Sequence, residues 1–403
     1  MNPAPDIPIG ERLRFYRQSQ HKSQAVIAGL AGVTEDYLSR VERGLKTPTI
    51  ATLHRLAVAL GVSVPVLLGE PSVTENGLVH PVASRIQAAL MSYGAPAGPG
   101  EVSLPALRSR VNEAWSAWQS APYRFTELSA VLPDLVVDVQ HAARAVRGDP
   151  AQARDAARLS ADLYFLLRTF TKRIGRPDLA LLVADRAMVA AQDAEDSLRL
   201  AAARWNLAHI LIAQGEPEGA LEVARAGAER LAPALESGAR EQAAMYGALW
   251  LVAAIATMRL GEPWAARDIL RDRALSAARV SGEGNVMWTV FGPSNVDLHA
   301  LSIEMEAGEA AEALRIADRI DIAASPSLER RTTFALEVAR CYEQRRDDAG
   351  VLVHLVSAES TGPEDLRYNL LARDLVRGLL KRARPSLAAQ AQGLAARVGL
   401  IDA

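Results

Sequence analysis

The sequence predicts an all-α protein in which a short N-terminal domain of five helices is followed by a long array of helical repeats. Three observations carry this prediction. Aromatic residues make up only 5% of the chain while Ala and Leu recur throughout, and this composition favours close-packed helices over β-sheets. At 403 residues the chain is too long for one compact core. A Gly followed five residues later by an Ala recurs in its second half, which is typical of stacked helix pairs.

The overall composition is that of an ordinary folded protein. Hydrophobic residues make up 49% and charged residues 23%, which argues against extensive disorder. Cys341 is the single cysteine, which excludes an intrachain disulfide and a multi-cysteine zinc site, and we expect it to be buried. The sequence opens without a signal-peptide pattern, and the apolar stretch at residues 248–258 is too short to span a bilayer. These features predict a cytoplasmic protein without a membrane segment.

Residues 9–69 are predicted to form five short helices with clear stop signals. Ser23 and Thr34 are suited to cap the second and third helices, and Gly32 supplies the permissive backbone of the turn between them. Gly44 is expected just past the end of the third helix. The apolar residues at helical spacing are Ile9, Leu13, Tyr16, Leu38, Val41, Leu53, Leu56, Ala57, Leu60, Val66 and Leu67, with Gly61 after the fourth helix.

The segment SQAVIAGLAGVTEDYLSRVERGLKTPTIATLHRLAVALGVSVPVLL resembles the lambda-repressor-type helix-turn-helix domain of the XRE family of transcriptional regulators. The resemblance is carried by Ser23-Gln24 at the start of the second helix, by Ala28 and Gly32, and by the run from Tyr37 to Gly44. In this family the third helix lies in the major groove and the second helix crosses the DNA backbone. The resemblance therefore implies binding to double-stranded DNA, as a homodimer on an inverted-repeat operator.

Nine residues are expected to face DNA if the domain docks as the XRE family does. Arg40 is the main candidate for reading sequence, because its planar fork can bind the two major-groove acceptors of a guanine. Gln24 is expected to contact a phosphate or a base, and Lys46 to hold a phosphate beside the start of the fourth helix. The full set is Gln24, Thr34, Glu35, Asp36, Tyr37, Ser39, Arg40, Lys46 and Thr47. The resemblance also implies an internal ion pair between Arg17 and Glu42.

Two alternatives stay open on this surface. Glu35 and Asp36 are acidic where many members of the family have neutral or basic residues, so they either accept hydrogen bonds from cytosine or partner Arg40. The excess of basic residues in the first 70 positions is small, and it does not distinguish a DNA-binding domain from one that only dimerises. The well-placed polar side chains of the third helix favour DNA binding.

A linker that contains one helix is predicted between the two parts of the chain. The helix spans residues 82–93, and the Gly- and Pro-rich stretch GAPAGPG follows it at residues 94–100. Two further helices are expected in residues 104–148. The predicted divisions are a helix-turn-helix domain at 1–70, the linker at 71–103 and a helical-repeat domain at 104–403.

A repeat appears beyond residue 150. The Gly and Ala recur as Gly175…Ala180, Gly215…Ala220, Gly261…Ala266 and Gly308…Ala313, at spacings of 40, 46 and 47 residues. Each copy joins two apolar helices, and the small residues let the paired helices approach closely. A fifth, weaker copy places Arg345 at the Gly position and Gly350 at the Ala position. This half resembles the tetratricopeptide-type sensor halves of multidomain XRE regulators, which include peptide sensors.

The resemblance implies that the first helix of each repeat lines a concave binding groove. The residues at these positions are Phe165, Thr169, Asn206, His209, Val252, Ile255, Asn295 and His299. The two Asn side chains either bind a ligand through their amides or bond a neighbouring helix. Four aromatic residues are expected to pack in the core or between repeats rather than to line a ligand site, namely Trp205, Trp250, Trp288 and Phe291.

The sequence lacks a helical zinc-binding motif, a nucleophile elbow and a dinucleotide-binding fingerprint, so we expect no enzyme activity, no cofactor and no metal site. It predicts a regulator in which a peptide or small molecule bound by the repeats controls operator binding. The alternative is a DNA-bound adaptor whose repeats dock a protein partner. A deep pocket closed by aromatic residues would favour the small ligand, and a flat polar surface would favour the adaptor.

Overall fold

The structure is a computed structural model that describes residues 8–19, 22–60, 62, 64–68, 80–93 and 103–401. Every regular element in these ranges is a helix, which confirms the predicted all-α class. The chain divides into two compact units, Met1–Leu78 and Val79–Ala403. Gly61, the Val66 side chain and the two stretches that flank the linker helix lie outside the described residues. Within the described ranges, none of the helices has the length and apolar character needed to cross a membrane.

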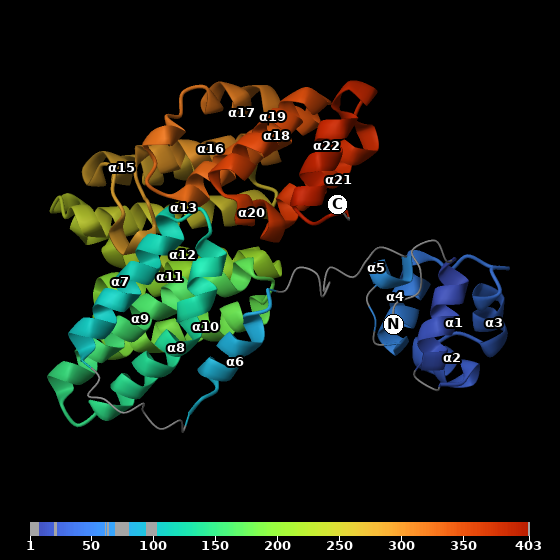
Figure 1. Ribbon diagram of the computed structural model, residues 1–403, viewed down its shortest axis with the longest axis horizontal. Coiled ribbons are helices and arrows are strands. Elements are labelled where there is room, and N and C mark those ends of the chain that lie inside the picture. The colour runs from blue at the N-terminus through green and yellow to red at the C-terminus, as the bar shows by residue number, and fades with distance from the viewer. Residues whose placement is uncertain are drawn as a thin grey trace. The chain divides into compact units, whose positions relative to one another are not determined.

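The first unit consists of the five predicted helices (Figure 1). Ser23 and Thr34 accept hydrogen bonds from the backbone N–H three residues further on, at 3.3 and 3.2 Å, so both predicted N-caps are confirmed. Gly32 and Gly44 have φ values of 63° and 73°, a left-handed conformation that glycine adopts without strain. The helices are α1 (Ile9–Ser19), α2 (Gln24–Ala31), α3 (Glu35–Glu42), α4 (Ile50–Leu60) and α5 (Val64–Leu68).

The second unit begins, in its described part, with the three helices predicted before the repeats, and α6 packs against α8. Most of the helices that follow are joined by turns of a few residues, and longer connections precede α16 and α18. Successive helices pack side by side. The bounds are α6 (Ala83–Leu90), α7 (Leu104–Ser120), α8 (Arg124–Ala145), α9 (Pro150–Arg173), α10 (Pro177–Asp193), α11 (Ser197–Gln214), α12 (Pro217–Glu236), α13 (Arg240–Arg259), α14 (Pro263–Ile269), α15 (Leu275–Ser281), α16 (Pro293–Glu306), α17 (Ala310–Ala317), α18 (Leu328–Gln344), α19 (Asp348–Thr361), α20 (Pro363–Tyr368), α21 (Leu370–Arg382) and α22 (Pro385–Arg397). A π-helical turn, Leu270–Ala274, joins α14 to α15, and 3-10 turns occur at Val286–Trp288 and Ile322–Ala324.

The four predicted Gly and Ala pairs occupy equivalent places in the helix pairs. All four glycines lie just past the end of a helix in the left-handed conformation, and their φ values run from 80° to 86°. The alanine five residues later is completely buried in every copy, because it lies where the second helix crosses its neighbour. These observations confirm the repeat that the sequence predicts.

The fifth copy is present, but its predicted register is wrong by one residue. Arg346, and not Arg345, adopts the left-handed conformation, with φ 59°. Val351 follows five residues later and is completely buried, so it takes the place of the alanine. Gly350 has a different role: a Cβ at this position would lie 2.4 Å from the Tyr342 ring, which packs directly on its backbone. Gly350 is therefore required for the contact with Tyr342 and does not mark the repeat.

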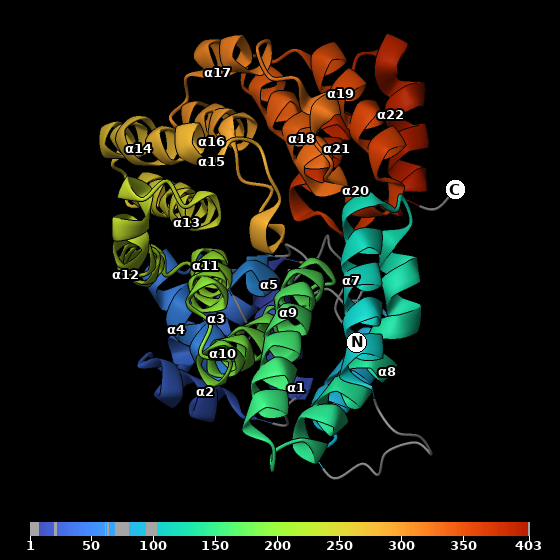
Figure 2. The ribbon, with the colours of Figure 1, turned by 90° about the vertical axis from the view of Figure 1, so that its left-hand side faces the viewer.

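The start of the second unit meets α20, which lies near its C-terminal end. Figure 2 shows α7 and α8 beside α20, with the intervening helices arranged around a ring. Arg124 at the start of α8 forms a fully buried ion pair with Asp365 of α20. Glu364 accepts hydrogen bonds from the backbone N–H groups of Phe125 at 2.7 Å and Thr126 at 3.2 Å. The N-terminus of α8 is thus capped by a residue almost 240 positions away, instead of by a local side chain.

Candidate nucleic-acid interface and ligand cavity

The third helix of the first unit presents the candidate DNA-reading face. Glu35, Asp36 and Arg40 are exposed on α3, whereas Tyr37 and Ser39 are half-buried. Thr34 is exposed at its start, and Lys46 and Thr47 are exposed in the segment between α3 and α4. The ammonium group of Lys46 lies 4.5 Å from the centre of the Tyr37 ring, which holds this cation beside α3.

Arg40 is paired with Asp36, one turn earlier on the same helix. The Nε–Oδ2 distance is 3.0 Å, and the two side chains are 56% and 67% exposed. The structure therefore shows the second of the two roles considered for Asp36. An ion pair this exposed contributes little to stability, because water and salt screen it. Arg40 can leave Asp36 for a DNA base at a small cost in free energy.

Gln24 is tied to an internal network at the base of this face. Arg17 binds Glu42 through two hydrogen bonds of 2.7 and 2.9 Å, which confirms the ion pair that the resemblance implies. These bonds to Glu42 raise the pKa of Arg17 above its ordinary value. The side-chain amide N–H of Gln24 donates a hydrogen bond to the same carboxylate at 2.7 Å. The network fastens α1 and α2 to α3, and a DNA contact by Gln24 stays a prediction.

The eight predicted groove residues do not line one surface. Phe165 and Val252 are completely enclosed in the core and Ile255 packs against it, so the structure corrects these three positions. The physical reason is that α9 and α13 are covered by other helices on both sides. Asn206 accepts a hydrogen bond from Arg168 Nε at 2.6 Å and donates one to a backbone carbonyl on its own helix at 2.8 Å. Its amide is thus bonded internally, as one of the two alternatives expected.

Asn295 and His299 lie together on α16. The Nδ1 atom of His299 is 2.8 Å from the backbone carbonyl of Asn295, and burial next to Arg330 lowers the pKa of His299 to about 3. The Asn295 side-chain oxygen is buried without a hydrogen-bond partner in the described residues. It lies in the wall of a cavity of ≈ 320 Å³ between α16 and the start of α18.

Thr169 and His209 line a second cavity, of ≈ 190 Å³, inside the second unit. Most of its wall was missed in the sequence. One signal was available, because Arg168, Lys172 and Arg173 place three basic groups within six residues at the end of α9, with no acidic residue among them. The wall consists of Trp115, Trp118 and Gln119 from α7, Arg168, Thr169, Lys172 and Arg173 from α9, Trp205 and His209 from α11, Trp288 and Val290 from the segment before α16, and Ser327, Glu329, Arg330 and Thr333 at α18.

Positive charge dominates this cavity. Arg173 binds Glu329 at 2.5 Å, and Glu329 is the only carboxylate in the wall. Burial alone would raise the pKa of Glu329, but the attraction of Arg173, Arg124 and Arg330 outweighs this effect. The pKa of Glu329 is therefore well below its ordinary value. Burial and the neighbouring cations lower the pKa of Arg168 to about 9 and that of Lys172 to about 7. Burial is the largest cause of both shifts, and the neighbouring cations add to it.

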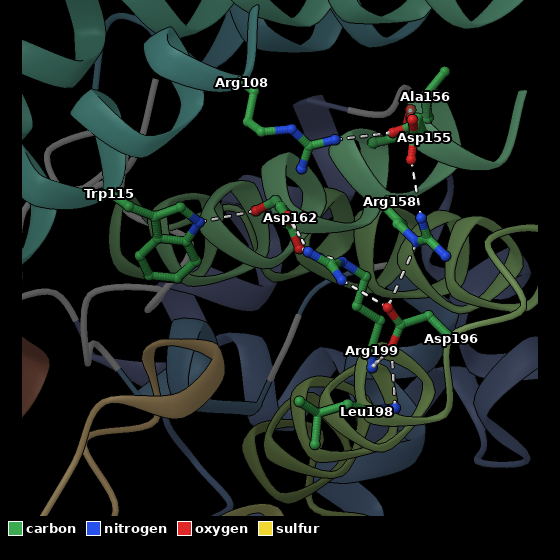
Figure 3. Close-up of polar contacts among 10 residues, drawn as sticks. Arg108, Trp115, Asp155, Ala156, Arg158, Asp162, Asp196, Leu198 and Arg199 are labelled. Atoms are coloured by element: carbon green, nitrogen blue, oxygen red, sulfur yellow. Dashed lines mark hydrogen bonds and ion pairs between the residues drawn. The ribbon is translucent and has the colours of Figure 1, made fainter. Parts of the chain in front are cut away.

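Tryptophan side chains form the apolar part of the wall. Trp115 and Trp288 stack with their planes 5° apart and their ring centres separated by 4.4 Å. Figure 3 shows how Trp115 is held: its indole N–H donates to the Asp162 carbonyl at 2.9 Å, and the Asp162 carboxylate binds Arg199 of α11. Trp205 and Trp288 pack against the core, as predicted, and both also line this cavity. Phe291 is completely buried, as predicted.

The segment that carries Trp288 is strained. Met287, Trp288 and Val290 have positive φ values of 47°, 59° and 50°, a conformation that is unfavourable for side chains other than glycine. The segment is held in place from two sides, by Arg330, which donates to the Thr289 carbonyl at 3.1 Å, and by Asn285, which exchanges hydrogen bonds with Gln119 of α7. Strain of this kind persists only where the surrounding contacts impose it, and it is concentrated at functional sites.

Two further predictions concern residues away from the cavity. Cys341 is completely buried, as expected, and burial raises its pKa to about 11. In the described part of the chain, no three His, Cys, Asp or Glu side chains lie close enough together to hold a metal ion.

Comparison with known proteins identifies the first unit. A family described as a helix-turn-helix domain matches residues 8–68. The HTH-type transcriptional regulator SinR of Bacillus subtilis (strain 168) is 43% identical over 68 residues. The match covers 17% of this chain and 61% of the length of SinR. The control protein C.SmaI of Serratia marcescens is 40% identical over 60 residues, which cover 15% of this chain and 71% of that protein.

A solved structure aligns with both units. Bacillus thuringiensis PlcR, in complex with the peptide PapR7 and DNA, aligns over 91% of this chain and 98% of its own, with 11% identity and a TM-score of 0.30. Both the sequence identity and the TM-score of this alignment are low.

Proposed function

Because this chain belongs to the helix-turn-helix transcriptional regulators of the XRE type, we propose that it binds operator DNA through α3 and that a ligand in its second unit controls this binding. The protein acts in the cytoplasm as a homodimer, and each α3 reads one half of an inverted repeat. The observation that carries the proposal is the exposed α3 face with Arg40 at its centre.

The α3 face has the parts that specific DNA recognition requires. Its outer residues are polar and exposed, and the Arg17–Glu42 network fixes the angle of α3 from behind. Arg40 can form two hydrogen bonds with a guanine once it leaves Asp36, whereas Lys46 and Thr47 are placed to contact phosphate. Base reading and backbone binding are thus assigned to different residues.

The cavity in the second unit supports sensing of a small ligand rather than docking of a protein. It is enclosed by four helices and closed by aromatic side chains, which is typical of ligand pockets and unlike a flat polar docking surface. Trp288 and Val290 belong to a strained segment, and a strained segment is suited to change its conformation when a ligand replaces its contacts.

Site selection from a random pool of double-stranded DNA, performed with the full chain, tests the DNA-binding half. Wild-type protein, Arg40→Ala and the matched control Arg14→Ala are then compared on the selected site and on its single-base variants. Arg14 is also exposed but lies on α1. We expect Arg40→Ala to lose discrimination at one base pair of each half-site, while Arg14→Ala keeps it. Failure to enrich any site, or unchanged discrimination in Arg40→Ala, would contradict the proposal.

A further inference from the structure

We propose that the cavity between α7, α9, α11 and the start of α18 binds a small organic anion, a carboxylate or phosphate joined to a flat apolar group. This inference rests on the proposed sensing function and specifies the chemistry of the ligand. Three independent observations lead to it: the charges in the wall, their hydrogen bonding, and the aromatic surface beside them.

The charges in the wall are unbalanced. Arg168, Lys172, Arg173 and Arg330 face a space that contains only one carboxylate, that of Glu329. Glu329 is already bound to Arg173. Removing several cations from water without matching anions is unfavourable, so proteins retain such clusters mainly where an anion binds. A ligand with one or two negative charges would match the excess.

The same cations have unused hydrogen-bond donors. Lys172 makes no hydrogen bond or ion pair with any described residue, although its side chain is half-buried. Arg168 uses Nε to bind Asn206, but its two Nη atoms make no hydrogen bond to the described chain. Arg330 uses one Nη atom for the Thr289 carbonyl. Free donors from α9 and α18 thus line the cavity, and a carboxylate or phosphate oxygen is the acceptor that suits them.

The remaining wall selects for a flat apolar group. Trp115, Trp118, Trp205 and Trp288 bring four indole rings to a space of ≈ 190 Å³. The guanidinium of Arg168 lies 5.2 Å from the centre of the Trp205 ring, so a cation and an aromatic surface are adjacent. A ligand with its anionic group at the cations and a ring against the indoles would contact both. The small volume favours a ligand with about one ring, or the end of a longer molecule, over a folded partner.

The experiment measures binding to the full chain by calorimetry and by tryptophan fluorescence. All six tryptophans lie in the second unit, so the fluorescence reports on that unit alone. The probes are phenylacetate, phenyl phosphate, inorganic phosphate and the neutral analogue phenylacetamide. A dipeptide that ends in phenylalanine, with a free or an amidated C-terminus, distinguishes a peptide carboxylate from a free small acid. We expect the aromatic anions to bind and phenylacetamide to bind at least about tenfold more weakly, since each charged hydrogen bond is worth about a decade or more.

Variants locate the site. Lys172→Met should weaken binding of the aromatic anions by about tenfold or more, because it removes the cation without a partner. Lys172→Arg should restore binding, and the control Lys381→Met, at an exposed lysine of α21, should bind as the wild type does. If Lys172→Met does not fold, Lys172→Arg and Trp288→Leu carry the test. Equal binding of phenylacetamide and phenylacetate, or no binding of any anion at millimolar concentration, overturns the proposal.

A titration with operator DNA separates this proposal from the function on which it rests. If the anions bind and shift operator affinity, both are supported, and linkage requires DNA to shift anion affinity by the same factor. If the anions bind without changing operator affinity, the anion site stands and the sensing function fails. If no anion binds while Arg40→Ala still loses base discrimination, DNA binding stands and the anion site fails.

Discussion

The first unit has an exposed ion pair on α3, whereas the second unit has a buried ion pair between α8 and α20. Arg40 and Asp36 form their pair with more than half of each side chain exposed, whereas Arg124 and Asp365 are almost completely buried. Water screens the first pair, so Arg40 can exchange its partner for DNA at little cost. The second pair was desolvated when the protein folded, and losing either partner leaves a buried charge without compensation. The exposed pair can thus exchange partners, whereas the buried pair is a fixed contact of the fold.

The largest effect is expected for the buried pair. Arg124→Met should lower the stability of the second unit by about 3–5 kcal/mol, because Asp365 stays buried without its cation. The matched control is Arg110→Met, which breaks the exposed ion pair between Arg110 of α7 and Asp138 of α8. This variant should change the stability by about 0–1 kcal/mol. Thermal unfolding followed by tryptophan fluorescence measures both variants. Similar losses in the two would show that burial does not distinguish these pairs.

Arg40→Ala should come second. It is expected to reduce the preference for the selected guanine by about 1–3 kcal/mol, or roughly one to two decades, and to leave weak binding to unrelated DNA. Competition with single-base variants of the operator, at constant salt, measures the preference. A uniform loss over all sequences would instead assign Arg40 to the phosphate backbone.

Lys172 provides a prediction with the opposite sign. Its pKa falls from 10.5 to about 7 in the folded protein, so between these values the unfolded chain binds more protons. The free energy of unfolding therefore increases as the pH rises above about 7. Below pH 7 the charged Lys172 lowers this free energy most. Lys172→Met should stabilise the second unit at pH 6 by at least about 1 kcal/mol, because each pKa unit of the shift corresponds to about 1.4 kcal/mol, and it should reduce the slope between pH 7 and 8.5. A destabilised Lys172→Met with an unchanged slope would show that Lys172 is compensated in the wild type.

The smallest effect is expected for Asp36→Asn. Because the pair with Arg40 is exposed, the stability of the first unit should change by less than about 0.5 kcal/mol. DNA affinity should increase slightly, since Arg40 is freed and a negative charge near phosphate is removed. Chemical denaturation of the full chain, followed by far-ultraviolet circular dichroism, and operator titrations would measure the two quantities. A large loss of stability would mean that Asp36 has a structural role besides pairing Arg40.

Local signals made the first unit predictable. Caps such as Thr34, turns such as Gly32 and the apolar spacing of short helices act within a few residues, and the Arg17–Glu42 pair follows from the family resemblance. The repeat glycines of the second unit are local signals of the same kind. The fifth copy was misplaced because Arg346 adopts the left-handed conformation without a glycine to announce it.

The cavity could not be predicted in the same way. Its wall joins Trp115, Lys172, Trp205, Trp288 and Arg330, which come together only when the helices close into a ring. Repeat phase alone places residues on a concave side but does not show which positions other helices cover. Phe165 and Val252 are therefore core residues, although their repeat positions predict a place in the groove. The strained segment at Met287 has no signature in the sequence.

The contact between α8 and α20 changes how the second unit can deform. An open helical array, in which each repeat touches only its neighbours, stretches and untwists along its axis as a spring does. Arg124 and Glu364 join the two ends, so this soft motion is removed and a displacement at one helix pair must be taken up by the others. The array should consequently unfold in one cooperative step rather than from its ends. A local displacement inside the ring would therefore move its outer helices together.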